Sequence, residues 1–203
     1  MTLQALVASY SGNLYAGEHE AELQYFRDRG LTDDTVTRFR LGWSTEFQGY
    51  SIPYLSATGK PVMVKVRRAA DSEARYKYIT EAHDFPLEQR THLFNVAAVL
   101  QPSVVIAEGE FDAMILEQCG IPAVAVPGAS TWHESWTPLI PGDAVIAFDG
   151  DSAGREGAEK LLATLSTRGR AVRLATLPDG YDITDLYLAE GCEAVKELIA
   201  SGQ

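Results

Sequence analysis

The chain has 203 residues, of which 46% are hydrophobic and 22% charged, and this ordinary globular composition excludes a disordered or fibrous protein. No apolar run approaches the ~18 residues that cross a bilayer, and the N-terminus has neither the basic start nor the apolar stretch of a signal peptide. We therefore expect a cytoplasmic protein without a membrane partner. The net charge of −11 is uneven: residues 1–100 hold 11 basic and 12 acidic side chains, whereas residues 101–203 hold 6 and 16.

The first hundred residues predict a small mixed α/β unit. Residues 1–17 are equally compatible with a helix and with a frayed arm. Residues 21–30 predict a short helix stopped by a glycine, and a second helix follows with Thr32 as its N-cap. The segments YSIPYL and PVMVKV flank SATGK and predict a β-hairpin with its turn at Thr58–Gly59. The stretch 69–103 is expected to be irregular, with a short helix near residues 94–100.

Basic side chains gather in and just after this hairpin. Residues 60–77 contain six of them and only two acidic ones, so a locally basic surface stands beside an acidic second half. This arrangement suits a protein that binds phosphates with one part and metals with the other, although a negative total also keeps a protein soluble without any such function. The six are Lys60, Lys65, Arg67, Arg68, Arg75 and Lys77.

From Val104 onward, short apolar strands alternate with helices, which predicts a parallel sheet covered by helices on both faces. We place the boundary near residue 102, which gives an N-terminal subdomain at 1–102 and a sheet domain at 103–203. The expected strands are 104–107, 123–126, 144–148 and 172–177. A helix follows each strand: the first ends near residue 120, and the others span about 132–139, 153–167 and 184–200.

Acidic motifs follow these strands: EGEFDA at 108–113 directly after the first and FDGDSAG at 148–154 at the end of the third. Ligands bind at the carboxyl ends of parallel strands, so Glu108 and the pair Asp149/Asp151 could meet there and hold a divalent metal against phosphate oxygens. Gly150 is expected to let a metal or phosphate approach the backbone. This pattern predicts metal-dependent chemistry on nucleic acid.

Further acids extend this set. Asp112 lies one helical turn beyond Glu108 and could support the metal ligands or join them. The loop after the fourth strand contributes Asp182 and Asp185. Clustered carboxylates are unfavourable unless cations neutralise them, although each acid taken alone could equally be a helix N-cap or a solvated turn residue.

The two cysteines, Cys119 and Cys192, lie far apart in the sequence. We expect two free thiols, as in a reducing cytoplasm. Two isolated cysteines with scattered histidines do not supply the four ligands of a zinc site, so no zinc is expected.

The two acidic motifs resemble the signature motifs of the Toprim domain, which bacterial-type primases, topoisomerases and certain nucleases share. The segments RGLTDDTVTRFRLGW, IPYLSATGKPVMVKVRR and LPDGYDITDLYLAEG resemble the catalytic core of bacterial-type (DnaG-like) primases. The resemblance covers about residues 20–200. It implies a Toprim-type α/β sheet preceded by a small mixed subdomain, and an enzyme that synthesises RNA primers on single-stranded DNA from ribonucleoside triphosphates.

The resemblance also implies residue roles. Glu108 would be a metal ligand or general base, and Asp149, Asp151 and Asp182 would bind two or more Mg²⁺ or Mn²⁺ ions, with Asp112 and Asp185 as further candidates. Among the basic residues, Arg67 and Lys77 would contact nucleotide phosphates or the template backbone, and Arg29 and Arg68 complete this candidate set.

The chain departs from the family in several respects. Segments corresponding to the zinc-binding and helicase-binding domains are missing, which suggests a phage-like protein with a separate zinc module or helicase as partner. The third motif reads DITD in place of D-x-D, so Thr184 or Asp185 could replace a ligand. Two alternatives stay open: a Toprim-type nuclease, and a non-catalytic subunit that binds single-stranded DNA in replication.

Overall fold

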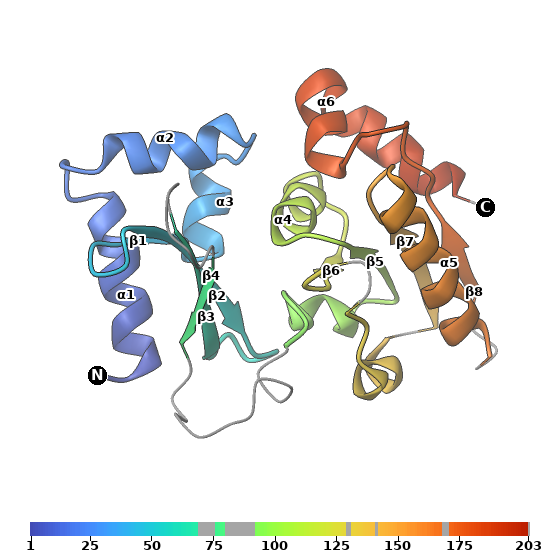
Figure 1. Cartoon of the computed structure of the whole chain (residues 1–203), viewed down its shortest axis with the longest axis horizontal. Helices are drawn as coiled ribbons and strands as arrows, with labels where there is room; N and C mark the ends of the chain where they lie inside the picture. The colour runs from blue at the N-terminus through green and yellow to red at the C-terminus, as the bar shows by residue number, and fades with distance from the viewer. Residues whose placement is uncertain (69–75, 80–91, 129–130, 141, 168–170, 203) are drawn as a thin grey trace. The chain divides into compact units, whose positions relative to one another are not determined.

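A computed structural model describes residues 1–68, 76–79, 92–128, 131–140, 142–167 and 171–202 (Figure 1). The chain divides into two compact units, Met1–His92 and Leu93–Gln203. This division lies about ten residues before the seam expected near residue 102. Its physical reason is that Phe94 and Ala125 exchange backbone hydrogen bonds of 3.0 and 3.3 Å, which join the segment after His92 to the second unit.

The first unit is an antiparallel sheet covered by helices. Its strands run in the order β1 (Gly42–Ser44), β2 (Gly49–Leu55), β3 (Pro61–Arg68) and β4 (Tyr76–Ile79). The predicted hairpin is confirmed, because β2 and β3 pair through a turn in which Gly59 has a φ of +77°. The expectation of an irregular segment after the hairpin is wrong for β4, which adds a fourth strand; residues 69–75 and 80–91 lie outside the described part.

Three helices accompany this sheet: α1 (Leu3–Leu14), α2 (Glu20–Asp28) and α3 (Asp33–Arg38). The helix α1 forms where the sequence left a helix and a frayed arm equally open, and it buries Leu3, Leu6 and Val7 against Val64 and Val66 of β3. Burial of this apolar stripe stabilises the helix, and Thr2 caps its N-terminus by accepting a hydrogen bond from the amide of Ala5 at 3.2 Å.

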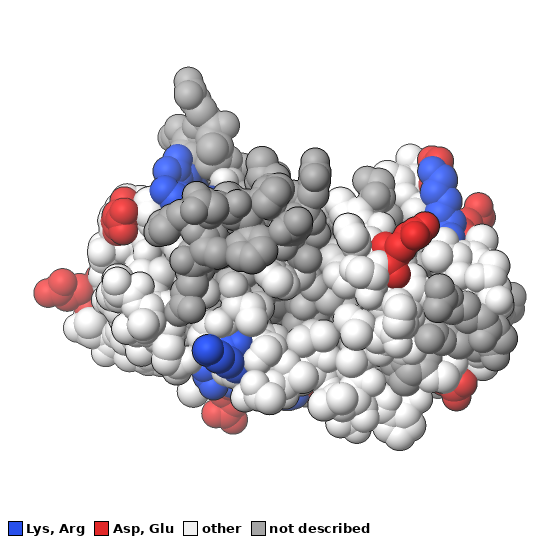
Figure 2. Space-filling view, turned by 90° about the horizontal axis from the view of Figure 1, so that it is seen from below, with Lys and Arg blue, Asp and Glu red and all other residues white. Residues whose placement is uncertain are grey.

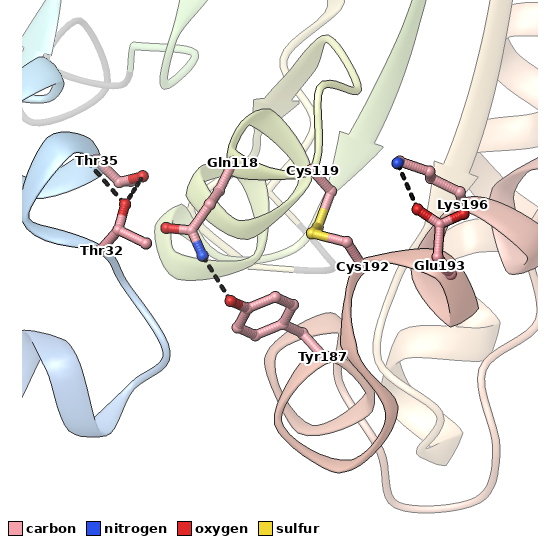
Figure 3. Close-up of a disulfide and its surroundings, with 8 residues drawn as sticks. All are labelled: Thr32, Thr35, Gln118, Cys119, Tyr187, Cys192, Glu193 and Lys196. Carbon is pink, nitrogen blue, oxygen red and sulfur yellow. Dashed lines mark hydrogen bonds and ion pairs between the residues drawn. A yellow bond between two sulfur atoms is a disulfide. The ribbon is translucent and has the colours of Figure 1, made fainter.

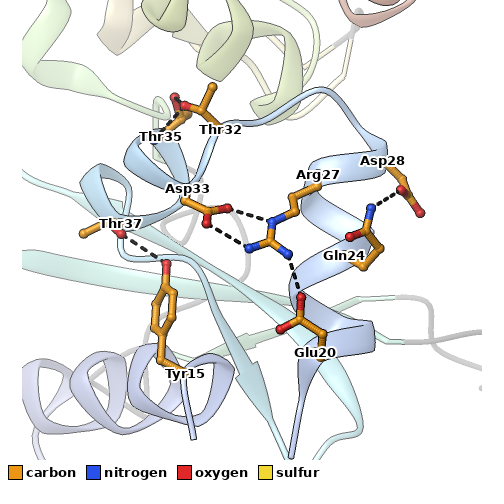
Figure 4. Close-up of polar contacts among 9 residues, drawn as sticks. All are labelled: Tyr15, Glu20, Gln24, Arg27, Asp28, Thr32, Asp33, Thr35 and Thr37. Carbon is orange, nitrogen blue, oxygen red and sulfur yellow. Dashed lines mark hydrogen bonds and ion pairs between the residues drawn. The ribbon is translucent and has the colours of Figure 1, made fainter. Parts of the chain in front are cut away.

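The two predicted helices that follow are confirmed. Thr32 is the N-cap of α3, and its hydroxyl accepts a hydrogen bond from the amide of Thr35 at 3.2 Å. Arg27 of α2 binds both carboxylate oxygens of Asp33 at 2.8 Å and also contacts Glu20 (Figure 4). This guanidinium links α2 to the first turn of α3.

The second unit is a parallel sheet of order β6-β5-β7-β8. Val104, Ile106 and Ile146 pack on one face against Leu161 and Leu165 of α5. The alternate strand residues are buried as well, and α4 and α6 pack against the strands and against each other. The predicted α/β class, a parallel sheet with helices on both faces, is confirmed. Its elements are β5 (Ser103–Ala107), α4 (Glu110–Gln118), β6 (Ala123–Ala125), β7 (Asp143–Ala147), α5 (Ser152–Ser166), β8 (Ala171–Leu174) and α6 (Ile183–Ser201), with the 3₁₀ helices η2 (Val96–Leu100) and η3 (Glu134–Leu139).

The expectation of two free thiols is wrong. Cys119 and Cys192 form a disulfide with a Cα–Cα distance of 5.3 Å, which joins the end of α4 to α6 (Figure 3). The residues are 73 positions apart in the chain, and only the packing of α4 against α6 brings them together. The cysteines therefore no longer indicate a reducing compartment. In the described part of the chain, no helix is both long and apolar enough to traverse a bilayer.

Candidate metal-binding site

The predicted acidic residues lie at the point where the strand order of the second unit reverses. From β5 the chain crosses to β6 on one side, whereas from β7 it crosses to β8 on the other side. Such a reversal leaves a crevice outside the carboxyl ends of the two central strands. Glu108 follows β5 directly and Asp149 follows β7 by two residues, and Ala107 and Ala147 are register partners. The sheet therefore brings the first two acidic motifs to one edge.

The third acidic motif is fastened to the second through Gly150. The amide of Gly150 donates a hydrogen bond to the carbonyl of Tyr181 at 2.8 Å, and the carbonyl of Gly150 accepts one from the amide of Gly180 at 3.0 Å. A Cβ at position 150 would collide with the carbonyl oxygen of Pro178. The expectation that Gly150 leaves its backbone open to a metal or phosphate is thus wrong: the chain itself approaches there, and this approach holds Asp182 near the edge.

Several of the acids are helix N-caps, the alternative that the sequence left open. Asp151 caps α5 and accepts from the amide of Gly154 at 2.7 Å. Asp182 caps α6, because its carboxylate accepts a hydrogen bond from the amide of Asp185 at 2.6 Å. In turn, the carboxylate of Asp185 accepts a hydrogen bond from the amide of Asp182 at 3.3 Å. A cap engages one carboxylate oxygen, so it does not prevent a metal contact through the other. The two helix N-termini also favour anionic groups such as phosphate.

Asp112 is the most enclosed of the acids. Its side chain is buried in the first turn of α4, and its Oδ1 accepts from both the amide and the hydroxyl of Thr184, at 3.1 and 2.9 Å. Burial, followed by the charge of Asp182, raises the pKa of Asp112 to about 8, although the hydrogen bonds from Thr184 act in the opposite direction.

Asp149 shows that the carboxylates lie close enough to influence one another. Burial raises its pKa to about 7, and the next largest cause is the charge of Glu108, followed by Asp182, Asp151 and Asp185. Each of these charges disfavours ionisation of Asp149, and a bound cation would offset their repulsion.

Glu108 contributes a second feature that favours a cation at this edge of the sheet. Its Oε2 is buried and has no hydrogen-bond partner among the described residues. A buried carboxylate oxygen without a partner is unfavourable, and a divalent cation would satisfy it. Within the described ranges, no three His, Cys, Asp or Glu side chains are arranged closely enough to hold a metal ion. Metal binding would therefore require side chains to rotate. Their hard oxygen donors fit Mg²⁺ or Mn²⁺.

The structure divides the predicted phosphate-binding residues of the first unit between two faces of its sheet. Arg67 is the register partner of Tyr76 and Lys77 that of Val66. Because directly opposed residues share a face and neighbours alternate, Arg67 and Lys77 lie on opposite faces. Alternation along β3 places Arg68 on the face of Lys77, where the Lys77 ammonium lies 4.0 Å from the ring centre of Phe47.

Arg67 and Arg29 lie beside one aromatic pair. Tyr25 and Tyr50 stack with their ring centres 3.7 Å apart, and the Arg29 guanidinium lies 5.2 Å from the centre of Tyr25. Tyr50 is the register partner of Arg67. Burial raises the pKa of Tyr50, and the positive charge of Arg67 partly opposes this shift. Lys65 shares this face and was not among the predicted site residues; its ammonium lies 4.4 Å from the ring centre of Tyr76.

Charged side chains are dispersed on one face of the molecule. On the face drawn in Figure 2, acidic and basic side chains occur in small scattered groups among the described residues. Arg155, at the start of α5, pairs with Asp179 at 2.9 Å. Neither observation points to a second charged site.

Comparisons with known proteins agree with this fold. Residues 105–187 match the Toprim-like family. The gene 57 protein of Mycobacterium phage D29 is 35% identical over 140 residues, which cover 67% of this chain and 85% of that protein. The DNA primase of Geobacillus stearothermophilus is 25% identical over 222 residues, covering 89% of this chain but only 37% of the longer enzyme.

A solved structure extends the likeness to the whole fold. The DnaG primase catalytic domain bound to single-stranded DNA aligns with a TM-score of 0.81 at 22% identity, over 98% of this chain and 79% of that one. The fold and the acidic motifs together define a Toprim-containing protein with an additional antiparallel unit. The chain belongs to the family of DnaG-type primase catalytic cores.

Proposed function

We propose that this chain synthesises short RNA primers on single-stranded DNA by metal-dependent nucleotidyl transfer. In that reaction a ribonucleotide 3′-hydroxyl attacks the α-phosphorus of a nucleoside triphosphate, a P–O bond forms, and pyrophosphate leaves. The observation that carries the proposal is the uncompensated acidic cluster at the reversal between β5 and β7. Membership of the primase family supports this reaction over others that acidic clusters serve.

The acidic residues would take the following roles. Asp149, Asp151 and Asp182 would bind two or more Mg²⁺ or Mn²⁺ ions. Glu108 would either join them through its unpartnered Oε2 or accept the proton of the attacking hydroxyl as a general base. When bound, the ions would neutralise charge that develops on the phosphate oxygens. Asp185, exposed beside Asp182, would add a further ligand.

The basic residues would bind substrate phosphates in two groups. Arg67 and Arg29, beside the Tyr25–Tyr50 pair, would contact the nucleotide phosphates. Lys77 and Arg68, on the opposite face, would contact the template backbone. This division follows from the alternation of β3 and β4, because side chains on opposite faces of a sheet cannot hold the same phosphate.

The proposed partners are single-stranded DNA and ribonucleoside triphosphates. The likeness to a DnaG domain that was solved with single-stranded DNA supports the first of these. We also propose that a separate zinc-bearing module or a helicase assists in choosing the start site. Adding such a protein to a priming reaction would test this assistance.

A priming assay tests the proposed function directly. The chain would be incubated with single-stranded DNA, labelled ribonucleotides and Mg²⁺ or Mn²⁺, with Asp149→Asn/Asp151→Asn as the matched inactive variant. Short labelled products that the variant fails to make are the expected result. Shortened DNA without incorporation would instead establish a nuclease, and DNA binding without either product would establish a non-catalytic replication subunit.

A further inference from the structure

Asp112 and Thr184 are in direct contact, and they join the N-termini of α4 and α6. Oδ1 of Asp112 accepts two hydrogen bonds, one from the backbone and one from the side chain of Thr184. The other oxygen, Oδ2, lies only 2.7 Å from where a Cβ on Gly109 would stand. The carboxyl is buried, with Oδ1 bonded to Thr184 and Oδ2 beside Gly109. Gly109 leaves the space that the carboxyl occupies.

The contact satisfies a helix end that would otherwise lack a partner. The first amides of a helix have no acceptor within it, and Thr184 is the second residue of α6, two positions after the cap Asp182. Asp112 supplies an acceptor from the neighbouring helix. Any movement of Thr184 would therefore displace Asp182 with it.

Other contacts between α4 and α6 lie farther from Asp182. Gln118 donates to the hydroxyl of Tyr187 at 2.9 Å, and the disulfide joins Cys119 to Cys192 (Figure 3). Gly191, with φ +81°, interrupts the helical backbone of α6 just before the disulfide. The disulfide thus holds the second part of α6, whereas the pair of Asp112 and Thr184 holds the end that carries the acidic motif.

We propose that Asp112 and Thr184 are a positioning pair, which holds Asp182 against the ends of β5 and β7, and that Asp112 acts as a hydrogen-bond acceptor and not as a metal ligand. This inference rests on the proposed metal-binding function. It assigns Thr184, the residue that departs from the D-x-D pattern, to the support of the metal ligands.

The two roles of Asp112 are separable by substitution. Asp112→Asn keeps a side-chain oxygen that accepts both hydrogen bonds from Thr184 but removes the carboxylate that a metal ligand requires. Thr184→Val keeps the branched shape and removes the hydroxyl donor, and Thr184→Ser restores that donor. Thr164→Val is the matched control, because the Thr164 hydroxyl donates to the Lys160 carbonyl on the exposed surface of α5.

The measurement is Mn²⁺ affinity of the full chain, read from the electron paramagnetic resonance signal of free Mn²⁺, with thermal unfolding as a check on folding. We expect Thr184→Val to weaken Mn²⁺ binding about tenfold, as is typical when a residue that orients metal ligands is removed. Thr184→Ser, Asp112→Asn and Thr164→Val should bind Mn²⁺ as the wild type does.

Loss of Mn²⁺ binding in Asp112→Asn would identify Asp112 as a ligand and overturn the proposal, as would unchanged affinity in Thr184→Val. If Thr184→Val does not fold, the Mn²⁺ affinities of Asp112→Asn and Thr184→Ser test the proposal, since each of these variants keeps the hydrogen bonds between positions 112 and 184. A wild type that binds Mn²⁺ but extends no primer would refute the proposed function alone, because the affinities still test the pair. A wild type that binds no Mn²⁺ would refute both.

Discussion

The amide of Gly150 and the carbonyl of Tyr181 are hydrogen-bonded at 2.8 Å, and this contact places the third acidic motif beside the second. It depends on a backbone approach that leaves no room for a side chain, since a Cβ on Gly150 would meet the Pro178 carbonyl. The acidic edge of the sheet is thus held together by backbone contacts between its loops as well as by its strands.

Gly150→Ala should therefore move the loop that carries Asp182 away from Asp149. We expect a loss of about 1–3 kcal/mol in the free energy of unfolding, as for other overpacked sites, and a weaker stabilisation by Mn²⁺. Urea unfolding with and without Mn²⁺ measures both effects. Gly142→Ala is the control, because a Cβ there meets nothing within 4 Å. Equal behaviour of the two variants would show that the Pro178 contact does not position the loop.

Asp149→Asn/Asp151→Asn should abolish stabilisation by Mg²⁺ or Mn²⁺ and leave the metal-free protein as stable as the wild type or more so. Asparagine still caps α5, while two repelling charges are removed. Thermal unfolding across a metal titration is the measurement. Asp143→Asn, at the opposite end of β7, serves as the control. A double variant that keeps the metal-induced shift would exclude both residues as ligands.

The metal-free protein should lose stability as the pH rises from about 5 to 8. The folded-state pKa is raised to about 7 for Asp149 and about 8 for Asp112, above the ordinary value of 3.8 for an aspartate. Their stabilising contribution is therefore complete below pH 4 and lost as the pH passes through the raised values. Urea unfolding at several pH values checks this, and Asp149→Asn should flatten the profile. Stability that rises over this interval would contradict the assignment.

Arg67→Ala should weaken binding of single-stranded DNA or nucleotide and lower the slope of log affinity against log salt by about 1, because one phosphate contact is lost. Fluorescence anisotropy over a series of salt concentrations provides the slope. Lys60→Ala removes the same charge from the exposed hairpin turn and should leave the slope unchanged. Identical slopes for wild type and Arg67→Ala would remove Arg67 from the proposed site.

Reduction of the disulfide should lower the free energy of unfolding by about 2–4 kcal/mol, because a long loop of the unfolded chain is released. Urea unfolding with and without a reducing agent measures the difference. The variant Cys119→Ser/Cys192→Ser should be equally stable in both conditions. Two thiols that react freely in the folded, unreduced wild type would show that the disulfide does not form.

Local patterns were sufficient for much of the fold. The hairpin around Gly59, the N-cap Thr32 and the strands that precede Glu108 and Asp149 were all predictable, because turn chemistry, capping and hydrophobic periodicity involve residues near one another in the chain. Since parallel strands align their carboxyl ends, the sequence alone also indicated which acids would reach one edge of the sheet.

Only the tertiary structure decided what these residues contact. The pair of Asp112 and Thr184 spans 72 positions and the disulfide 73, and neither leaves a local pattern. The helix α1 was left undecided and the strand β4 was missed for a related reason, since α1 is stabilised by packing on Val64 and Val66 and β4 by pairing with β3. Sequence periodicity determines which face of an element is apolar, whereas the partner of that face depends on how the whole chain packs.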